Sequence, residues 1–423
     1  GGANVNMKEG RWGFNLSYNY NTGENVTDGT TDRVDRSFGT TTGFFGQDTR
    51  STSTRLMNGG RFGVDWQMSN RNLLTLSAST RGHNNEGNDL LKSTTLDAER
   101  NLLNTGEQRN TSMSDNMSYS VQLVFRRRTP KQGREWTTDL SYNRSERTSD
   151  AEFDQYTYSS DGDQLPYSPR LQDNIGESEN EQLSWQLDYA DPIGERNKIE
   201  WGLKSNVKRD NSFLDVYVTS PLVGTDVLDS SLTNNYHITD IINAAYVNWM
   251  HKLSDHWSFQ AGFRFEQTWF ETELLGKDIT FSYKYPDGTK NLAKALFPGI
   301  YLSRKWDGSL REVQVNFSRK ISRPNFWQIM PFVMFSDSRN VRIGNPALAP
   351  ELSSLAEVNH LLPFMNSKAT WFTSLFGRYT QDVITSYASP LASDTTVLLN
   401  TFINGSYSAS TGWENIVKIE PKQ

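Results

Sequence analysis

Apolar and polar residues alternate with a period of two in many short segments of the chain. In residues 12–20, for example, Trp12, Phe14, Leu16, Tyr18 and Tyr20 are separated by small or polar residues. The same alternation recurs in residues 62–68, 183–189, 257–265, 313–317 and 371–379. Because successive side chains of a strand point to opposite faces, each segment predicts a strand with one apolar and one polar face. No comparable helical stripe is present, so the sequence predicts a nearly all-β protein.

The connections between these segments alternate in length. Short polar turns are centred near Lys8, Asn70, Lys131, Gly194, Ser254, Asp307 and Met365. Long polar connections alternate with the turns and cover residues 21–60, 82–114, 147–180, 210–235, 271–291, 322–352 and 381–399. A transmembrane barrel has short periplasmic turns at one rim and long external loops at the other, and its closed sheet pairs every backbone group in lipid. The sequence therefore predicts an antiparallel transmembrane β-barrel with about fourteen strands.

The composition of the chain fits a β-barrel and argues against several other classes of protein. Hydrophobic residues make up 35% of the chain, yet aromatics make up 12%, as expected when only one face of many strands is apolar. No run of apolar residues approaches the length of a transmembrane helix. The absence of Cys excludes disulfides, Cys-ligated zinc and Cys nucleophiles. A formal charge of −6 argues against a nucleic-acid partner.

One segment carries a distinctive motif. Residues 317–332 read FSRKISRPNFWQIMPF, and residues 344–351 read GNPALAPE. An Arg-Pro step at a strand end, followed by an Asn-Pro-x-Leu-x-Pro-Glu loop, resembles the barrel signature of TonB-dependent outer-membrane receptors, in particular the outer-membrane β-barrel family common in Bacteroidetes. The segment Gly63 to Ser69 resembles the strand-and-turn pattern of the same family.

The resemblance implies a 22-stranded barrel with an N-terminal plug in its lumen and a segment that contacts TonB. This sequence departs from that pattern, because it contains no recognisable plug or TonB-contacting segment and too few strands. We therefore expect residues 1–423 to be an outer-membrane β-barrel domain that forms part of a larger barrel. The contact with TonB would belong to an N-terminal region outside this sequence.

The motif also has a physical interpretation. Pro324, Pro331, Pro346 and Pro350 cannot donate to a ladder, so the stretch between them should leave the sheet, and Glu351 should mark its return. The motif residues are then a rigid structural frame; they are Pro324, Asn345, Pro346, Leu348, Pro350 and Glu351. Direct contact with cargo is the alternative.

Four charged residues are candidates for ligand binding. Arg319 and Arg323 lie near one rim and could bind anionic groups of cargo or lipid, or could pair with carboxylates of neighbouring strands. Asp161 and Asp163 lie in residues 150–181, which hold nine acids and one base. This acidic segment could attract cations, hold divalent ions that bridge to lipopolysaccharide, or only keep a loop soluble.

Three further features allow two interpretations each. The apolar residues 212–228 predict an external hairpin that covers the barrel mouth or binds a surface lipoprotein, or a segment that folds into the lumen. The basic residues 126–134 could meet inner-leaflet phosphates or could form a solvated turn. The tryptophans at strand ends fit an interfacial girdle better than carbohydrate stacking.

No catalytic function is expected. The chain has no Gly-x-Ser-x-Gly elbow, His-Glu-x-x-His helix or phosphate loop, and His251 and His256 flank a turn without a carboxylate cluster. We expect neither a cofactor nor a metal site. The sequence predicts a TonB-dependent importer in the outer membrane of a Gram-negative bacterium, with membrane lipid or lipopolysaccharide around it. The alternatives are a passive porin or structural barrel and a soluble adhesin-like β protein.

Overall fold

The chain forms an almost entirely β structure. The computed structural model describes residues 1–37, 40–219, 224–230, 232–276, 279–288, 292–330, 333–337, 340–365, 368–391 and 394–419. The first strands are β1 (Gly2–Glu9), β2 (Trp12–Ser37), β3 (Thr40–Gln67), β4 (Asn72–Asp97), β5 (Leu102–Arg128), β6 (Glu135–Ser159), β7 (Arg170–Ile193), β8 (Asn197–Thr219), β9 (Asp226–Leu228), β10 (Asn235–Lys252) and β11 (Trp257–Leu275).

The remaining elements are shorter and include two brief helical turns. They are β12 (Ile279–Tyr285), η1 (Leu292–Ala295), β13 (Leu296–Lys305), β14 (Glu312–Ser322), α1 (Phe326–Ile329), β15 (Val333–Asp337), β16 (Asn340–Ile343), β17 (Glu351–Phe364), β18 (Ala369–Gln381), β19 (Ile384–Leu391), β20 (Asp394–Asn404) and β21 (Tyr407–Ile419). Within the described ranges, no helix is both long and apolar enough to span a membrane.

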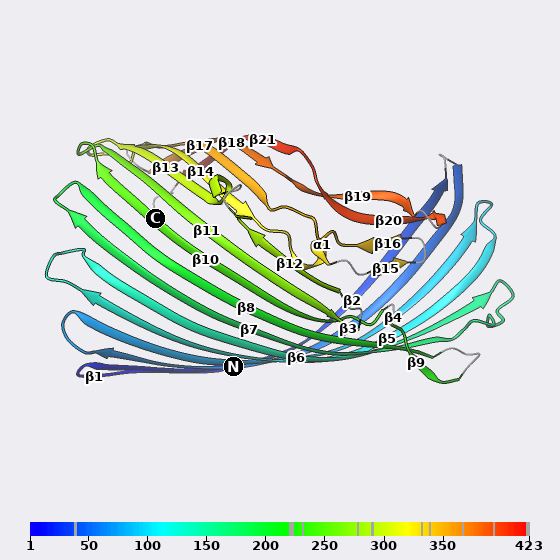
Figure 1. The fold of residues 1–423 in the computed structure, drawn as a ribbon. Coiled ribbons are helices and arrows are strands. Elements are labelled where there is room, and N and C mark those ends of the chain that lie inside the picture. The colour runs from blue at the N-terminus through cyan, green and yellow to red at the C-terminus, as the bar shows by residue number, and fades with distance from the viewer. Residues whose placement is uncertain are drawn as a thin grey trace.

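The main sheet is an antiparallel meander of 17 strands. Its long strands pair in the order β1, β2, β3, β4, β5, β6, β7, β8, β10, β11, β13, β14, β17, β18 and β21, while β9 adds to β8 and β12 adds to β11. The sheet curls into a deep trough (Figure 1). Among the described residues, β1 and β21 each pair along one edge only, so the sheet is not closed into a barrel.

The two faces of the sheet differ in polarity. One set of alternate side chains, the outward rows, is apolar and exposed, as at Phe263 (57% exposed) and Leu375 (59% exposed). The other set faces the lumen, since Leu274 of β11 packs with Met330, and Phe270 of β11 packs against the cluster that contains Ile329. Apolar rows facing lipid and polar rows facing a lumen are the arrangement of an outer-membrane barrel wall.

The seven predicted short turns are confirmed. They join β1 to β2, β3 to β4, β5 to β6, β7 to β8, β10 to β11, β13 to β14 and β17 to β18. All of them lie at the left end of the trough in Figure 1, and the hairpin tips lie at the right. Because short turns mark the periplasmic rim of such barrels, the left end is periplasmic. These turns account for fourteen long strands, and β21 is an additional strand.

The prediction of long external loops is wrong for the first half of the chain. Strand β2 contains 26 residues and β3 contains 28, so residues 21–60 are almost entirely paired strand. Crossing a bilayer takes about 9–11 residues of a tilted strand. The remainder extends beyond the membrane, where both faces meet water. Polar residues then occupy both faces, and the alternation disappears although the strands continue.

The motif stretch leaves the sheet as predicted. Strand β14 ends at Ser322, and the chain returns to the main sheet at Glu351, the first residue of β17. Between them, β15 and β16 join β19 and β20 in a second, four-stranded sheet in which β16 and β20 run parallel. Pro331 lies outside the described residues.

Side-chain hydrogen bonds hold the motif in place. The Asn345 amide Nδ2 donates to the carbonyl of Phe402 (2.9 Å), and its Oδ1 accepts from the Ala347 backbone N–H (2.9 Å). Leu348 is 3% exposed and packs with Phe402. A Glu351 carboxylate oxygen accepts from the Ile384 backbone N–H (2.8 Å). The motif residues Asn345, Leu348 and Glu351 therefore join the β14–β17 connection to β19 and β20.

The assignment of faces predicts different effects for substitutions at two positions of β5. Leu123 lies in an outward row, and Ser120 lies in the lumen-facing row of the same strand. We expect Leu123→Arg to lower the free energy of unfolding by about 2–4 kcal/mol, because a cation near the bilayer midplane is poorly solvated. Ser120→Arg should change it by less than about 1 kcal/mol. Urea unfolding of the full-length protein in liposomes measures both; equal losses would contradict the assignment.

The motif contacts predict a local effect of Asn345→Ala. The substitution removes two hydrogen bonds, each contributing about 1 kcal/mol, so amide hydrogen exchange at Ala347 and Leu348 should accelerate by about tenfold or more. Asn25→Ala is the matched control, because among the described residues the Asn25 amide bonds the exposed Thr27 hydroxyl alone (3.1 Å). Unchanged exchange at Ala347 would show that Asn345 does not hold the loop.

Candidate functional site

A cavity of about 220 Å³ lies on the lumen face beneath the motif loop. The barrel wall contributes side chains from β8, β10, β11 and β12, and the covering side contributes the Arg323-Pro324-Asn325 segment, α1 and the motif proline Pro346. In Figure 1, α1 lies between β12 and β16, nearer the hairpin tips than the turns. The cavity therefore opens on the external side of the lumen.

Arg323 anchors the covering loop to the wall at this cavity. Its Nη2 lies 2.5 Å from a carboxylate oxygen of Glu266, and its Nε donates to the Thr268 hydroxyl (2.8 Å). Glu266, which is 9% exposed, also accepts from Arg264 (2.6 Å). A buried carboxylate between two guanidinium groups is a strong, directional arrangement. The sequence allowed two interpretations of Arg323, binding of an anionic group and pairing with a strand carboxylate. The structure shows the pairing, with Glu266, and the Arg323 side chain also lines the cavity.

Arg319 does not share this site. It lies in β14 two residues beyond Phe317, in the outward row that contains Val315 and Phe317. Its recorded side-chain hydrogen bond is a long one, 3.5 Å to the carbonyl of Ala293. Arg319 does not line the cavity that Arg323 lines, and no recorded contact in the described ranges joins the two arginines.

Two buried polar groups at the cavity lack hydrogen-bond partners among the described residues. They are Oδ1 of Asp240, in β10, and the hydroxyl of Tyr283, in β12. The rings of Phe270 and Phe281, whose centroids are 5.6 Å apart, form the apolar part of the wall. Leaving a buried polar group unpaired costs free energy. The arrangement suits a ligand that donates a hydrogen bond to Asp240 and places an apolar part on the two rings.

The charges near the cavity are partly compensated within the wall. The Lys208 ammonium lies 2.8 Å from a carboxylate oxygen of Asp210, which also accepts a hydrogen bond from Asn180. Asp240 lies in the electrostatic reach of both Lys208 and Arg323. The cavity thus presents both signs of charge, which favours a zwitterionic or mixed polar ligand over a simple anion.

Asp161 and Asp163 lie far along the chain from this cavity, at the tip of the β6–β7 hairpin. Both are exposed, and the turn is held by backbone bonds, among them Ser159 N–H to Asp163 O (2.8 Å) and Gly162 N–H to Ser159 O (3.0 Å). No recorded contact in the described ranges joins them to Arg319 or Arg323. Their role in ligand binding stays a prediction.

The other acids of the same hairpin face away from the lumen. Seven of them continue the outward rows of β6 and β7: Asp150, Glu152, Asp154, Asp173, Glu177, Glu179 and Glu181. Arg144 pairs with Glu179 (3.0 Å) and Glu181 (3.8 Å). Burial raises the pKa of Asp173, and the neighbouring carboxylates of Asp226, Asp150 and Asp154 raise it further. A cation-attracting surface, if the hairpin provides one, lies on the outside of the wall.

The apolar segment 212–228 forms the predicted hairpin in its described part. Residues 212–219 extend β8, and β9 pairs back onto it, with Tyr217 opposite Leu228. Val216 is buried (2% exposed), and Val227 is exposed (56%). Leu222 and Val223 lie outside the described residues. Binding of a surface lipoprotein there stays a prediction.

The histidines that flank the β10–β11 turn have separate partners. His251 contacts the Asn197 side chain (2.8 Å), and His256 contacts Asp307 (2.6 Å). In the part of the chain that the structure describes, no group of three or more His, Asp or Glu side chains is arranged to hold a metal ion.

Sequence reasoning missed Asp240 and Tyr283. A signal for Asp240 was present, since this carboxylate interrupts a run that contains Ile238, Ile241 and Ile242. A charged residue in such a run has to find a partner or serve a ligand. Tyr283 gave no such signal, because it lies in β12, which is not one of the predicted wall strands and which, in the described ranges, pairs with β11 alone.

Solved structures similar to this chain include a copper transporter and complexes of FpvA and FpvAI. The copper transporter OprC gives a TM-score of 0.56 at 11% identity, over 99% of this chain and 60% of that chain. FpvA of P. aeruginosa, in complex with a heterologous pyoverdine, gives 0.53 at 10% identity, over 99% and 53%. The FpvAI–pyocin S2 complex gives 0.54 at 9% identity, over 96% and 52%. The chain thus shares their fold and spans about half to three-fifths of their length.

No curated protein matches the chain. The sequence model of the outer membrane protein beta-barrel family, however, matches residues 127–423. This range includes the cavity, the motif and the wall from the start of β6 to the end of β21. A Bacteroidetes origin stays a prediction. The chain therefore belongs to the outer membrane protein beta-barrel family, whose place is the outer membrane of Gram-negative bacteria.

Proposed function

We propose that the full-length protein is a TonB-dependent transporter that imports a ligand captured at the external cavity. The observation that carries the proposal is a pair of buried groups at a lumen-facing cavity, Asp240 Oδ1 and the Tyr283 hydroxyl, for which the described part of the chain supplies no hydrogen-bond partner. A barrel that served only as a scaffold would gain stability by pairing or replacing them. Their presence is explained if a ligand completes their hydrogen bonds.

The covering loop supports the same proposal. Arg323 fixes the start of the loop to Glu266, and Asn345 fixes its end to the second sheet. The cavity is therefore built from two rigid parts, as a selective site requires. A passive porin needs a wide, open lumen and no such cover.

The polar side chains of the lumen face support the binding of a further domain inside the barrel. Its rows are rich in short polar side chains that bond one another, as in Gln122 with Asp139 (2.6 Å) and Gln182 with Asn206 (2.6 Å). We propose that this face contacts a plug domain, which TonB would displace during import. The structurally similar proteins, which include a copper transporter and a pyoverdine complex, are longer than this chain.

The free edges of β1 and β21 support further strands in the full-length protein. Unpaired backbone groups in lipid cost several kcal/mol each, so we propose that additional strands, from this protein, close the barrel between these edges. The alternative of a soluble adhesin-like protein is wrong, because the chain belongs to an outer-membrane family. A passive porin or structural barrel remains the alternative that experiment has to separate.

Conductance and TonB binding separate the transporter from the porin without knowledge of the ligand. We expect the full-length protein in planar lipid bilayers to show no steady channels, because a plug fills the lumen, and to bind the purified C-terminal domain of TonB. Single-channel recording and a pull-down measure these two properties. Steady channels together with no binding of TonB would establish the porin instead.

The cavity predicts unusual stability effects for Asp240→Asn. Because Asp240 Oδ1 has no hydrogen-bond partner among the described residues, the substitution should leave the free energy of unfolding unchanged or raise it by about 1 kcal/mol. Asp188→Asn is the matched control, since this lumen carboxylate accepts bonds from Gln186 (2.8 Å) and Tyr246 (2.5 Å). It should cost about 1–3 kcal/mol. Urea unfolding measures both, and an equal loss for Asp240→Asn would make Asp240 a structural residue.

Transport provides the functional readout of the same variant. Iron-loaded pyoverdine and Cu²⁺ serve as probes, in cells that express the full-length protein. The probe that wild-type cells accumulate is used for the comparison. Asp240→Asn should reduce uptake of this probe about tenfold or more. Asp188→Asn should reduce uptake only in proportion to the amount of folded protein in the membrane.

A further inference from the structure

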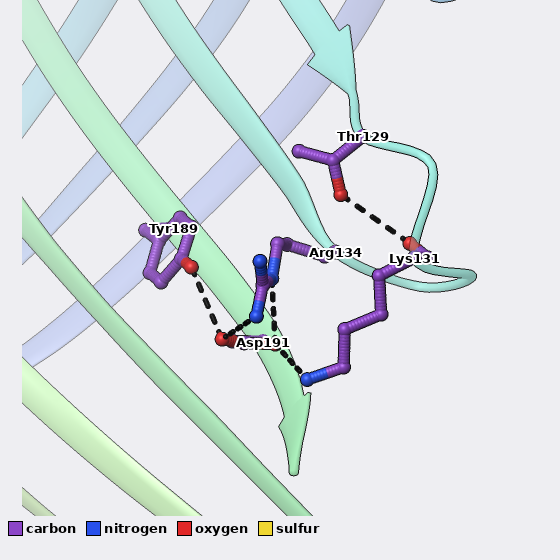
Figure 2. A network of polar contacts seen from close by, with 5 residues as sticks. All are labelled: Thr129, Lys131, Arg134, Tyr189 and Asp191. Carbon is purple, nitrogen blue, oxygen red and sulfur yellow. Dashed lines mark hydrogen bonds and ion pairs between the residues drawn. The ribbon is translucent and has the colours of Figure 1, made fainter.

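A fixed cluster of charges lies at the periplasmic turn between β5 and β6. The carboxylate of Asp191, near the end of β7, accepts hydrogen bonds from the Lys131 ammonium (2.7 Å) and from Nε of Arg134 (2.9 Å). Nη2 of Arg134 reaches its second oxygen at 2.8 Å, and the Tyr189 hydroxyl donates to that oxygen at 3.2 Å. Figure 2 shows Lys131 and Arg134 converging on Asp191 from the turn.

The turn itself is ordered by its own bonds. Thr129 N–H donates to the Arg134 carbonyl (3.0 Å), and Arg134 N–H donates to the Lys131 carbonyl (3.1 Å). Gly133 supports the turn with a φ of 77°, in the left-handed region that glycine adopts without strain. Lys131 and Arg134 thus have fixed backbone positions as well as a fixed ionic partner.

The cluster lies on the outward face, at the depth of the membrane interface. Tyr189 is opposite Trp136 and Trp201 in the pairing of β6, β7 and β8, and Asp191 follows Tyr189 in the same outward row. The Trp136 ring centroid is 4.2 Å from that of Tyr189 and 5.4 Å from that of Trp201. Such clusters of Trp and Tyr sit at the level of lipid headgroups. Asp191, on the turn side of the rings, is therefore outside the apolar band.

Asp191 is ionised where it binds its two cations. The Arg134 guanidinium, followed by the Lys131 ammonium, holds the pKa of the Asp191 carboxyl far below its usual range. The carboxylate is thus charged at any physiological pH. It positions the two cations outward, and it neutralises only one of their two charges.

The cations retain donors for an external anion. Nη1 of Arg134 has no recorded hydrogen bond among the described residues, and Lys131 uses one of its three N–H groups. Arg127 lies directly opposite Trp136 in the same outward row, is exposed and forms no recorded ion pair in the described ranges. Three cations and one carboxylate leave a local excess of positive charge above an aromatic surface.

We propose that Arg127, Lys131 and Arg134 form a binding site for the phosphodiester of an anionic phospholipid in the periplasmic leaflet. The phosphate accepts from the two guanidinium groups and the ammonium, and the acyl chains lie on the rings of Trp136 and Trp201. Guanidinium groups bind phosphate oxygens in pairs, which makes the contact directional. Asp191 is a positioning residue, because it holds Lys131 and Arg134 toward the headgroup. A turn that only met solvent would need neither the ion pairs that fix its side chains nor the Trp rings beside it.

Native mass spectrometry of the full-length protein tests this site. The protein is extracted in a mild detergent and offered equal amounts of phosphatidylglycerol and phosphatidylethanolamine. Wild type should retain phosphatidylglycerol preferentially. Arg127→Gln/Lys131→Gln should weaken that retention about tenfold or more, since each basic residue near a membrane surface contributes about fivefold to the binding of anionic lipid.

The matched control removes the same charge at the same end of the barrel. Arg196, in the turn between β7 and β8, and Lys252, the last residue of β10, line a lumen cavity of about 570 Å³. Arg196→Gln/Lys252→Gln should therefore leave lipid retention unchanged. The heat-dependent shift on a detergent gel verifies that each variant is folded. Arg127→Gln alone provides a second variant, because it breaks no recorded side-chain contact, and it should weaken retention several-fold.

Three results would overturn the proposal. They are equal retention of the two lipids by wild type, unchanged retention in Arg127→Gln/Lys131→Gln, and an equal loss in the lumen-facing control. Soluble glycerophosphoglycerol distinguishes a lipid site from a phosphate site. It should not displace the bound lipid, because it lacks the acyl chains that contact the rings; complete displacement would contradict the lipid site.

Discussion

The need to pair backbone polar groups in the absence of water governs this structure. Within a bilayer an unpaired N–H or C=O has no solvent partner, so each strand must have a neighbour on both sides. From β2 to β18 the long strands of the main sheet meet this condition, and the antiparallel meander is the simplest way to meet it with short turns. Once the pairing is fixed, the two-residue period decides which side chains meet lipid and which meet the lumen. The positions of the lipid-facing rings, the lumen cavity and the outward acids all follow from that register.

Alternation and turn spacing were sufficient to predict the wall near the membrane. Segments such as Trp12 to Tyr20 have a row of apolar side chains that faces lipid, and each such row ends at a short turn. The external halves of β2 to β7 could not be recognised in the same way. Both of their faces meet water, so nothing in the order of Thr, Ser, Asp and Asn separates a paired strand from a loop. Their regularity comes from the neighbouring strands, which continue the hydrogen-bond ladder beyond the membrane.

The candidate site was predicted less well than the wall, because the chain leaves the sheet and changes direction at the cavity. Arg319 and Arg323 are four residues apart, which suggests a shared rim, but β14 ends at Ser322 and the proline after Arg323 turns the chain toward the lumen. Alternation holds only inside a strand, so it could not place Arg323. Asp240 is in a regular strand, yet its importance depends on β12 and the motif loop, which come from distant parts of the chain. By contrast, the prolines around Asn345 and Leu348 were enough to predict that this stretch leaves the main sheet, while the structural role of the two residues stays a prediction.

The parallel pairing of β16 with β20 has a mechanical consequence. Backbone ladder contacts from Asn340 to Arg342, paired with Leu398 to Asn400, join the β14–β17 and β18–β21 connections into one body. Neither connection can swing away from the lumen while the other stays, unless those contacts break. Arg323 attaches the same body to β11 through Glu266. The cavity beneath α1 therefore opens cooperatively. The two connections move together, so few partly open conformations exist.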